Sequence, residues 1–358
     1  MPSKNSIKNY REKHPHQVRM TSEEYATWRN FKSEIRDRES LLKDEADAAG
    51  IDLKDIKHYW YKSEKFSMFA KNESKTYEEL RDEIIVEMDK YSPKYPKIKR
   101  KPSKDGHLLV ISPADVHLGK LASSFETSDP YNHHIAYNRC IDGVKGILDK
   151  SSGFNIDKIN LIIGNDILHV DNPRNTTTKG TNQDTSLMWY DSFRLARELY
   201  VEVIEMLLAV ADVHLTYNPS NHDYMSGFML ADSIKSWFRL SKNVTFDFSI
   251  AHRKYFKYGK NLIGSTHGDG AKHDKLPQLM SIEAKKEWSE CEHYYIYTHH
   301  LHHKTSKDYM NVNVETLRSP SGTDSYHHIN GYEHAPKAIE GFIHCKNHGQ
   351  VSRLTHIF

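Results

Sequence analysis

The pattern of apolar and polar residues changes at a short segment that is rich in proline and lysine. Before it, apolar residues recur with helical spacing behind capping signals such as the one at residues 74–78. The segment itself combines prolines with dense positive charge, which neither a helix nor a central strand accommodates. After it, short β-rich runs alternate with helical stretches. We therefore predict four regions, which are a loose basic tail over residues 1–21, a helical domain over 22–92, a linker over 93–105 and a catalytic domain over 106–358.

The last region contains five short apolar runs that predict strands and two longer amphipathic stretches that predict helices. The predicted strands are residues 108–111, 159–163, 213–217, 261–263 and 294–297, and the predicted helices are residues 133–148 and 186–211. Strands that alternate with helices are typical of an α/β or α+β architecture.

Length and composition restrict the class of protein. A chain of 358 residues has room for two or three domains. No uncharged apolar run approaches the ~20 residues that span a bilayer, so we expect no membrane segment. The polar, basic N-terminus lacks the apolar core of a signal peptide, and the three scattered cysteines fit a reducing compartment. We expect a soluble protein of the cytoplasm.

Positive charge is concentrated before the end of the linker. Residues 1–104 carry 24 lysines and arginines against 19 acidic residues, a net charge of +5, whereas the rest of the chain carries −3. Ala46, Gly50 and Ile56 have the spacing of a helix-turn-helix. The basic side chains of its second helix would contact DNA phosphates, and they are Lys54, Lys57, His58 and Lys62. An ordinary helical hairpin explains the same pattern, so DNA contact by this domain stays open.

Histidine is unusually frequent, with 24 residues against 17 glycines, and it is the commonest metal ligand in proteins. Polar clusters follow each of the five predicted strands. They are Asp115-Val116-His117, residues 164–169, residues 220–223, residues 266–269 and residues 299–303. A single cluster of this kind is an ordinary turn or a surface histidine. Five in succession indicate one site at the ends of the strands, where open α/β sheets bind ligands.

In this order the clusters resemble the signature of the calcineurin-like metallophosphoesterases, which is D-x-H, G-D-x-x-(D/H), G-N-H-(D/E), a single H and G-H-x-H. All five blocks have counterparts between Asp115 and His302, and the resemblance covers most of residues 106–358. It implies an α+β fold of the αββα type, a two-sheet sandwich flanked by helices. Here the sandwich would follow the small all-α, helix-turn-helix-like domain. The resemblance also implies two metal ions at the ends of the sheets.

The resemblance assigns roles by position. One metal would be held by Asp115, His117 and His302, the other by Asn221, His267 and His300, and Asp166 would bridge both. His222 would face the substrate, and Asp223 would help to orient it. The family has glycine before three of the ligands, where this chain has Asn165, Ser220 and His299. These departures concern the local backbone, because every ligand is retained.

The charge of this ligand set suits phosphate chemistry. Two divalent ions bring +4, and only Asp115 and Asp166 among the proposed ligands are anionic, so about +2 remains to attract a phosphate. A water shared by ions ~3.5–4 Å apart would be acidified toward hydroxide and directed at phosphorus. Imidazole mixed with carboxylate and amide oxygen suits manganese, iron or zinc better than magnesium, and we expect Mn²⁺.

His169 bears on the choice of substrate. It lies three residues after Asp166, where phosphatase branches of the family often carry aspartate and the double-strand-break repair nuclease branch carries histidine. The resemblance is therefore nearest to that nuclease branch. It implies that one of His169 and His222 protonates the leaving 3′ oxygen and that the other stabilises the pentacovalent charge. A histidine that only holds its loop is the alternative role for His169.

One further segment is a candidate for substrate contacts, and another bears on the origin of the protein. Residues 172–184 follow the second cluster, and we expect a loop over the site in which Lys179, together with Arg253, meets substrate phosphates. A solvated loop fits the same residues equally well. Residues 318–332 resemble the tail of phage-encoded members of the superfamily, which implies a bacteriophage or prophage origin within a bacterial cell.

We therefore expect a dinuclear-metal-dependent phosphodiester hydrolase that acts on DNA as an exonuclease or endonuclease, with a metal-activated hydroxide attacking the phosphate. The first alternative is a phosphatase or nucleotide phosphodiesterase for small or protein substrates. The second is a non-enzymatic DNA-binding or assembly protein with a relic metal site. DNA is the expected partner. Family nucleases often work with an ATPase, but the sequence identifies no surface for it or for a second copy.

Overall fold

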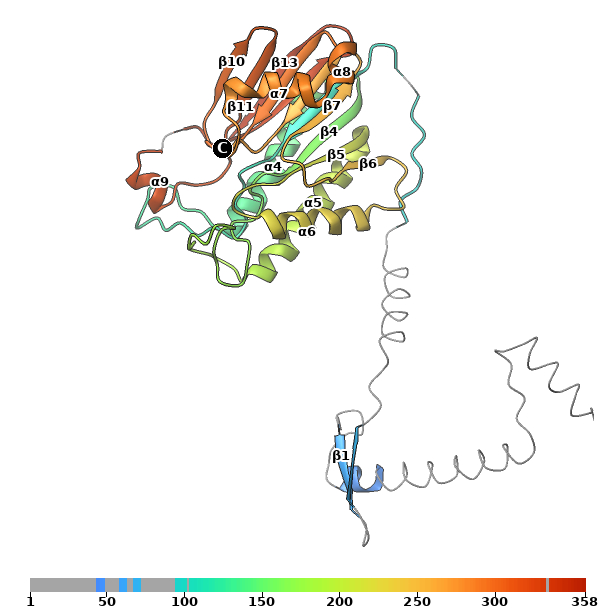
Figure 1. Ribbon diagram of the computed structural model, residues 1–358, viewed down its shortest axis with the longest axis vertical. Coiled ribbons are helices and arrows are strands. Elements are labelled where there is room, and N and C mark those ends of the chain that lie inside the picture. Colours follow the sequence, from blue (N-terminus) through green and yellow to red (C-terminus); the bar gives the residue numbers. More distant parts are fainter. Residues whose placement is uncertain (1–42, 49–57, 63–66, 72–93, 102, 333–334) are drawn as a thin grey trace, which may run out of the picture. The chain divides into compact units, whose positions relative to one another are not determined.

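The computed structural model describes residues 43–48, 58–62, 67–71, 94–101, 103–332 and 335–358 (Figure 1). The chain divides into two compact units, which are Met1–Tyr91 and Ser92–Phe358.

In the first unit, residues 43–48 are helical and two strands follow. β1 (His58–Lys62) pairs antiparallel with β2 (Ser67–Lys71). The prediction of a purely helical domain is wrong for these strands, so His58 and Lys62 do not lie on a recognition helix. The aromatic residues in the middle of β1 explain the difference, because aromatic side chains favour strands.

Several predictions for the first unit fall outside the described residues. They are the loose tail over residues 1–21, the turn and second helix of the helix-turn-helix at Gly50 and Ile56, and the DNA contacts of Lys54 and Lys57.

The second unit contains two sheets. The six-stranded sheet has the order β13-β12-β3-β4-β5-β6, in which β3 to β6 run parallel and β12 pairs antiparallel with both β3 and β13. Its strands are β3 (His107–Ser112), β4 (Ile156–Gly164), β5 (Asp212–Asn218), β6 (Val244–Asp247), β12 (Ala338–Cys345) and β13 (Gly349–Ile357).

The five-stranded sheet has the order β10-β11-β9-β8-β7, with a parallel centre and antiparallel strands at both edges. Its strands are β7 (Lys254–Tyr258), β8 (Asn261–Ser265), β9 (His293–Thr298), β10 (Thr305–Tyr309) and β11 (Val312–Thr316).

Helices cover the outer faces of both sheets (Figure 1). Three pack on the six-stranded sheet, and they are α4 (His133–Ser151), α5 (Trp189–Val210) and α6 (Tyr224–Trp237). The five-stranded sheet is covered by α7 (Leu276–Glu283), which follows the short 3-10 helix η2 (His273–Lys275) and precedes α8 (Lys285–Glu290). α9 (Ser325–Ile329) lies in the connection from β11 to β12. The predicted two-sheet sandwich flanked by helices is confirmed.

Burial on both faces explains why the central strands are continuously apolar. Successive side chains of a strand point to opposite faces. In β3, Leu109 and Ile111 belong to the core beneath the helices, whereas Leu108 and Val110 belong to the core between the sheets. The sequence therefore shows an unbroken apolar run rather than an alternation.

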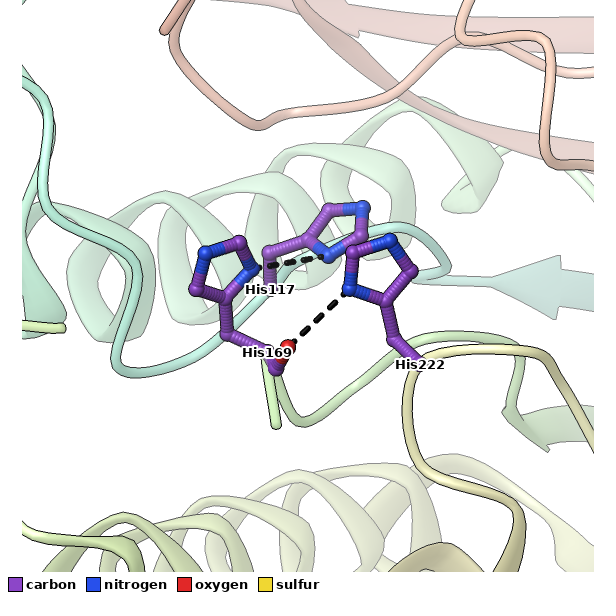
Figure 2. Close-up of side chains that lie close together, drawn as sticks. All are labelled: His117, His169 and His222. Carbon is purple, nitrogen blue, oxygen red and sulfur yellow. Dashed lines mark hydrogen bonds between the residues drawn. The ribbon is translucent and has the colours of Figure 1, made fainter. Parts of the chain in front are cut away.

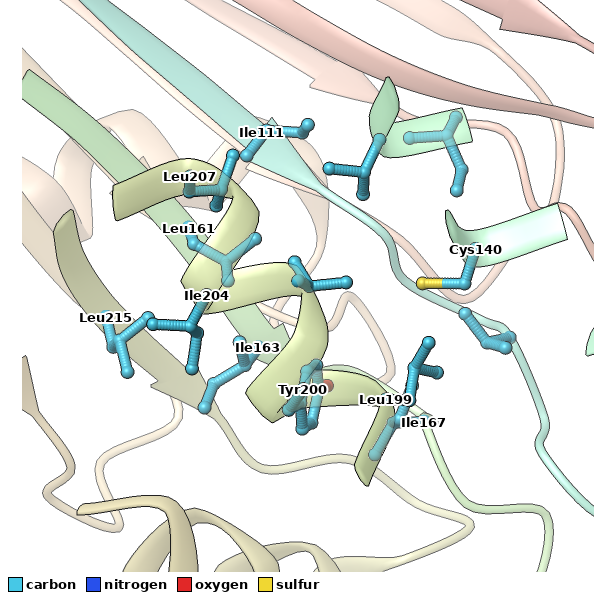
Figure 3. Packing of buried hydrophobic residues seen from close by; sticks show 14 of the residues in the cluster. Ile111, Cys140, Leu161, Ile163, Ile167, Leu199, Tyr200, Ile204, Leu207 and Leu215 are labelled. Carbon is cyan, nitrogen blue, oxygen red and sulfur yellow. The ribbon is translucent and has the colours of Figure 1, made fainter. Parts of the chain in front are cut away.

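The largest core lies between α5 and the six-stranded sheet (Figure 3). Tyr200 and Ile204 of α5 pack there with Leu161 of β4. The Tyr200 hydroxyl also accepts a hydrogen bond from the Gly164 backbone N–H at 3.0 Å. This bond fixes the end of β4, which is the point from which the second polar cluster departs.

Residues 94–101, in the predicted linker, contain no helix or strand. They belong to the second unit and pack on its sandwich. The Tyr95 ring stacks on Phe238 with a centroid distance of 4.9 Å. The Ile98 backbone N–H donates to Asn243 Oδ1 at 2.9 Å. These contacts attach the segment to the sandwich.

All five predicted strands fall within β3, β4, β5, β8 and β9, and the two predicted helices correspond to α4 and α5. Within the described residues, every helix is too short or too polar to cross a bilayer.

Candidate metal centre

The carboxyl ends of five strands meet where the two sheets are tied together. β5 of one sheet ends at Asn218, and β8 of the other ends at Ser265. Ser265 Oγ donates to Asn218 Oδ1 at 2.7 Å, and Asn218 Nδ2 donates to the Ser265 carbonyl at 3.1 Å. Because of this link, loops that are far apart in the sequence open onto the same place.

The first two polar loops continue the pairing of their strands. The Asp115 N–H donates to the Asn165 carbonyl at 2.8 Å, and the His117 N–H donates to the Asp166 carbonyl at 3.0 Å. The loops after β3 and β4 therefore hold Asp115 and His117 beside Asp166 before any side-chain contact is considered.

Asp115, His117 and His302 form the first group of potential ligands, with one ligand atom of each within 4.8 Å of the other two. The Nε2 atoms of His117 and His302 are 3.3 Å apart, and His302 Nε2 is 3.6 Å from Asp115 Oδ1. A cation bonded to two imidazoles at ~2.0–2.1 Å keeps their nitrogens about 3 to 3.4 Å apart. Asp115 Oδ1 is buried and has no hydrogen-bond partner among the described residues, so a cation would satisfy it.

Asp166, His267 and His300 form the second group by the same distance criterion. His267 Nε2 lies 3.1 Å from Asp166 Oδ2 and 2.9 Å from Asn221 Oδ1. A carboxylate, an amide oxygen and imidazoles facing one point are a ligand set for a divalent transition metal. All seven predicted ligands thus lie in two neighbouring groups, which the His300 N–H joins by donating to Asp115 Oδ2 at 3.1 Å, and the bridging role of Asp166 stays a prediction.

The electrostatics of the site favour a bound cation. Burial would raise the pKa of Asp166, but the charges of His267 and His222 outweigh it and hold that pKa below its usual value. Burial would lower the pKa of His267, but Asp166 outweighs it and raises that pKa to about 9. A proton on His267 and a metal ion would therefore compete for the same position.

The backbone is strained where the ligands lie. Left-handed φ angles occur in eight non-glycine residues of the described part of the chain, and six of them belong to this site. They are Asp115, His117, Asn165, Asp166, His300 and His302, with φ between 48° and 71°. Such conformations cost about 1–3 kcal/mol each and persist mainly where function requires them. Asn165 can hold this conformation because asparagine tolerates the left-handed region better than most residues.

His169 and His222 lie beside His117 and form a third group of close imidazoles with it (Figure 2). His169 Nδ1 is 3.4 Å from His117 Nδ1, and His222 Nδ1 is 3.0 Å from the His169 carbonyl. A carbonyl only accepts, so His222 carries its proton on Nδ1 and presents Nε2 to a ligand. Burial lowers the pKa values of both His117 and His169 well below the usual value, and the nearby His222 lowers them further.

Asp223 supports the loops of the site. Ser220 Oγ accepts from the Asp166 N–H at 2.7 Å and donates to Asp223 Oδ1 at 2.6 Å. Asp223 Oδ2 accepts from the Leu168 N–H at 3.0 Å. Its carboxylate thus joins the loop of Asp166 to the loop of Asn221, and the expected orienting role of Asp223 stays a prediction.

A cavity of about 740 Å³ opens over both half-sites. Six residues of the predicted loop line it, and exposed Lys179 is one of them; they are Thr177, Lys179, Thr181, Asn182, Gln183 and Asp184. Arg253 is not among the described residues that line this cavity, and its guanidinium pairs with Glu283 through contacts of 2.6 and 2.9 Å. The structure therefore brings Lys179 to the cavity and leaves Arg253 at another contact.

Sequence reasoning missed the groups that support the site. In the sequence, Ser220 is only a departure from the glycine of the signature that the chain resembles, and Lys120 belongs to no motif. His299 stands where the family has glycine, and its buried ring lies 3.1 Å from Ser112 Oγ through Nε2. The only signal in the sequence was position, because each of these residues lies within five places of a predicted ligand.

Neither a family model nor a curated protein matches this chain. Several solved structures are similar to it. A novel archaeal phosphodiesterase is 8% identical over 70% of this chain and 99% of its own, with a TM-score of 0.34. Vps29 from Chaetomium thermophilum is 11% identical over 71% and 97%, with a TM-score of 0.31. A predicted phosphoesterase from Streptococcus pneumoniae TIGR4 is 13% identical over 72% and 99%, with a TM-score of 0.27. At these values the functional assignment depends on the site itself.

Proposed function

We propose that this protein is a dinuclear-metal-dependent phosphodiester hydrolase that acts on DNA as an exonuclease or endonuclease. The observation that carries the proposal is the convergence of seven predicted ligands, from five loops of two sheets, into two neighbouring groups beneath one cavity, with Asp166 proposed as the ligand that both metals share. Two divalent cations, when bound, would acidify a shared water and neutralise charge on a phosphate.

The side chains around the half-sites supply the remaining chemistry. His222 donates its Nδ1 proton to the His169 carbonyl, which leaves Nε2 for the substrate, and the imidazolium form would donate a hydrogen bond from Nε2 to a phosphate oxygen. Its own backbone N–H donates to Asp166 Oδ1 at 2.9 Å, which fixes the ring relative to the shared carboxylate. The ring is thus positioned beforehand to meet charge that develops on the phosphate.

The contact between His169 and His117 favours a phosphodiester as substrate. If His117 binds a cation through Nε2, its single proton lies on Nδ1 and is donated to Nδ1 of His169. The proton of His169 then lies on Nε2, and this residue also lines the cavity. His169 therefore supports a ligand and can also donate a hydrogen bond from Nε2–H to the charge that develops on a leaving oxygen.

The size of the cavity also suits a polymer rather than a lone phosphate. Its volume of about 740 Å³ is typical of sites that enclose a whole nucleotide-sized ligand. Lys179 lies at its lining, and its charge would attract a second phosphate of the strand.

The test is hydrolysis by the full chain with and without Mn²⁺. Substrates are linear, nicked and single-stranded DNA beside bis-p-nitrophenyl phosphate and p-nitrophenyl phosphate. We expect Mn²⁺-dependent cleavage of DNA and of the diester. Rapid turnover of the monoester with no DNA cleavage would instead select the phosphatase alternative, and failure to bind Mn²⁺ would select the non-enzymatic one.

Variants separate the roles of the shared ligand and of His169. Asp166→Asn removes the bridging charge, so we expect both Mn²⁺ binding and hydrolysis to be lost. His169→Ala should reduce DNA cleavage at least 100-fold, the lower range for loss of one hydrogen-bond donor to developing charge. His348→Ala is the matched control, because this histidine is exposed in the connection from β12 to β13. Full nuclease activity of His169→Ala would contradict the nuclease assignment.

A further inference from the structure

The connection from β11 to β12 brings another histidine to the cavity. Its short helix α9 places the His327 side chain among the lining residues, next to the ligand His302. The rings of His327 and His302 stack with a centroid distance of 5.1 Å and an interplanar angle of 16°. His327 therefore stands over the half-site of Asp115, His117 and His302.

The His327 ring is held by a carboxylate that is itself fixed. Asp324 Oδ1 accepts from the His327 backbone N–H at 2.9 Å and from His327 Nδ1 at 2.6 Å. Asp324 Oδ2 pairs with Lys120 Nζ at 2.8 Å. Because Asp324 receives the proton of Nδ1, the nitrogen that remains for a ligand in the cavity is Nε2.

Lys120 connects this arrangement to the metal ligands. It lies in the same loop as Asp115 and His117, and only 1% of its surface is exposed. Its Nζ also donates to the Gly322 carbonyl at 2.7 Å. A buried lysine is costly unless it is paired, so its pairing with Asp324 locks α9 against the loop that carries two ligands.

The charge of Asp324 is secured by its partners. Burial acts to raise its pKa, but the hydrogen bond from His327 and the charge of Lys120 hold that pKa well below the usual value. The carboxylate therefore orients the imidazole in the way that carboxylates orient histidines in many active sites.

We propose that His327 is a further substrate-binding residue: as an imidazolium paired with the Asp324 carboxylate, it donates its Nε2–H to an oxygen of the phosphodiester beside the Asp115, His117 and His302 half-site. Asp324 and Lys120 are positioning residues for it. The inference rests on the proposed function and adds a substrate contact that the five polar clusters do not contain.

Two substitutions test this contact with different geometry. His327→Asn retains an N–H near the position of Nδ1, so it can still bond to Asp324, but it has no atom at the position of Nε2. His327→Gln can place an amide near the position of Nε2. His328→Asn is the matched control, because the next histidine is not among the described residues that line the cavity.

The full chain and these three variants are compared in hydrolysis of bis-p-nitrophenyl phosphate and in Mn²⁺ affinity by titration calorimetry. A lost hydrogen bond to a charged group predicts a kcat/KM about 10- to 100-fold lower in His327→Asn. We expect unchanged Mn²⁺ affinity, partial recovery in His327→Gln and wild-type behaviour in His328→Asn.

Two outcomes overturn the inference directly, and a third tests the proposed function first. Wild-type kcat/KM in His327→Asn means that the ring makes no contact with substrate. A parallel loss of Mn²⁺ affinity means that it acts by supporting His302 instead. If the wild-type chain binds Mn²⁺ but hydrolyses no ester, the proposed function fails. The affinity of the Mn²⁺-loaded proteins for inorganic phosphate then decides the inference, because equal affinity in the wild type and His327→Asn overturns it and weaker affinity in the variant supports it.

Discussion

Single residues hold the loops of this site in place, one through side-chain hydrogen bonds and another through its backbone conformation. Ser220 stands where the family signature has glycine, and its buried hydroxyl accepts from the Asp166 N–H and donates to Asp223. Asn165 keeps the left-handed backbone that the glycine before Asp166 would allow. The substitutions are therefore compatible with the ligand geometry, because one supplies a bridge and the other adopts the required conformation.

Ser220→Ala tests the bridge. The change leaves the Asp166 N–H and a carboxylate oxygen of Asp223 buried without this partner, which costs about 1–3 kcal/mol. We expect the free energy of unfolding, measured by urea denaturation without metal, to fall by that amount. Ser281→Ala is the control, because the hydrogen bond of its hydroxyl to a carbonyl of its own helix is exposed, and its loss should stay within about 0.5 kcal/mol. Equal effects of the two changes would refute the bridging role.

The sequence predicts some strands of the sandwich and not others. The five apolar strands that precede the ligands are predictable because both of their faces are buried. β10 is not, because its residues are polar and largely exposed at the edge of the sheet. The pairing of Lys120 with Asp324 could not be predicted either, since it joins positions about two hundred residues apart and depends on the packing of the whole sandwich.

The contact between the sheets leads to a prediction about acid stability. His344 of β12 is fully buried, and its Nε2 lies 2.9 Å from the Tyr297 hydroxyl of β9. Burial, and then the nearby His293, lower the pKa of His344 to about 3. As the pH falls, His344 of the unfolded chain is therefore protonated before His344 of the folded chain. The contribution of neutral His344 to the free energy of unfolding is complete above pH ~6.5 and is lost as the pH falls toward 3.

His344→Gln should remove this pH dependence while keeping a hydrogen-bonding side chain. The unfolding free energy of the wild type should drop by about 2 kcal/mol more than that of the variant between pH 7.5 and pH 5.0. Urea denaturation at the two pH values measures the difference, and His348→Gln serves as an exposed control. An identical drop in wild type and His344→Gln would show that His344 is not held neutral.

In the second unit, the candidate site lies where loops from the two sheets meet. Asp115, Asp166 and Asn221 follow strands of the six-stranded sheet, whereas His267 and His300 follow strands of the other. A metal pair would therefore bind across the sandwich, and each half-site would be incomplete if the sheets were apart. The resemblance of the five clusters to the family signature predicts the ligands and their division between two metals, but only the folded sandwich shows that each group takes side chains from both sheets.

Anomalous diffraction at the manganese edge, from crystals of the full chain grown with Mn²⁺, tests this arrangement most directly. The account predicts two peaks per chain about 3.5–4 Å apart. One should lie at Asp115, His117 and His302, the other at Asn221, His267 and His300, and Asp166 should contact both. A single peak, or peaks away from Asp166, would contradict the shared dinuclear centre.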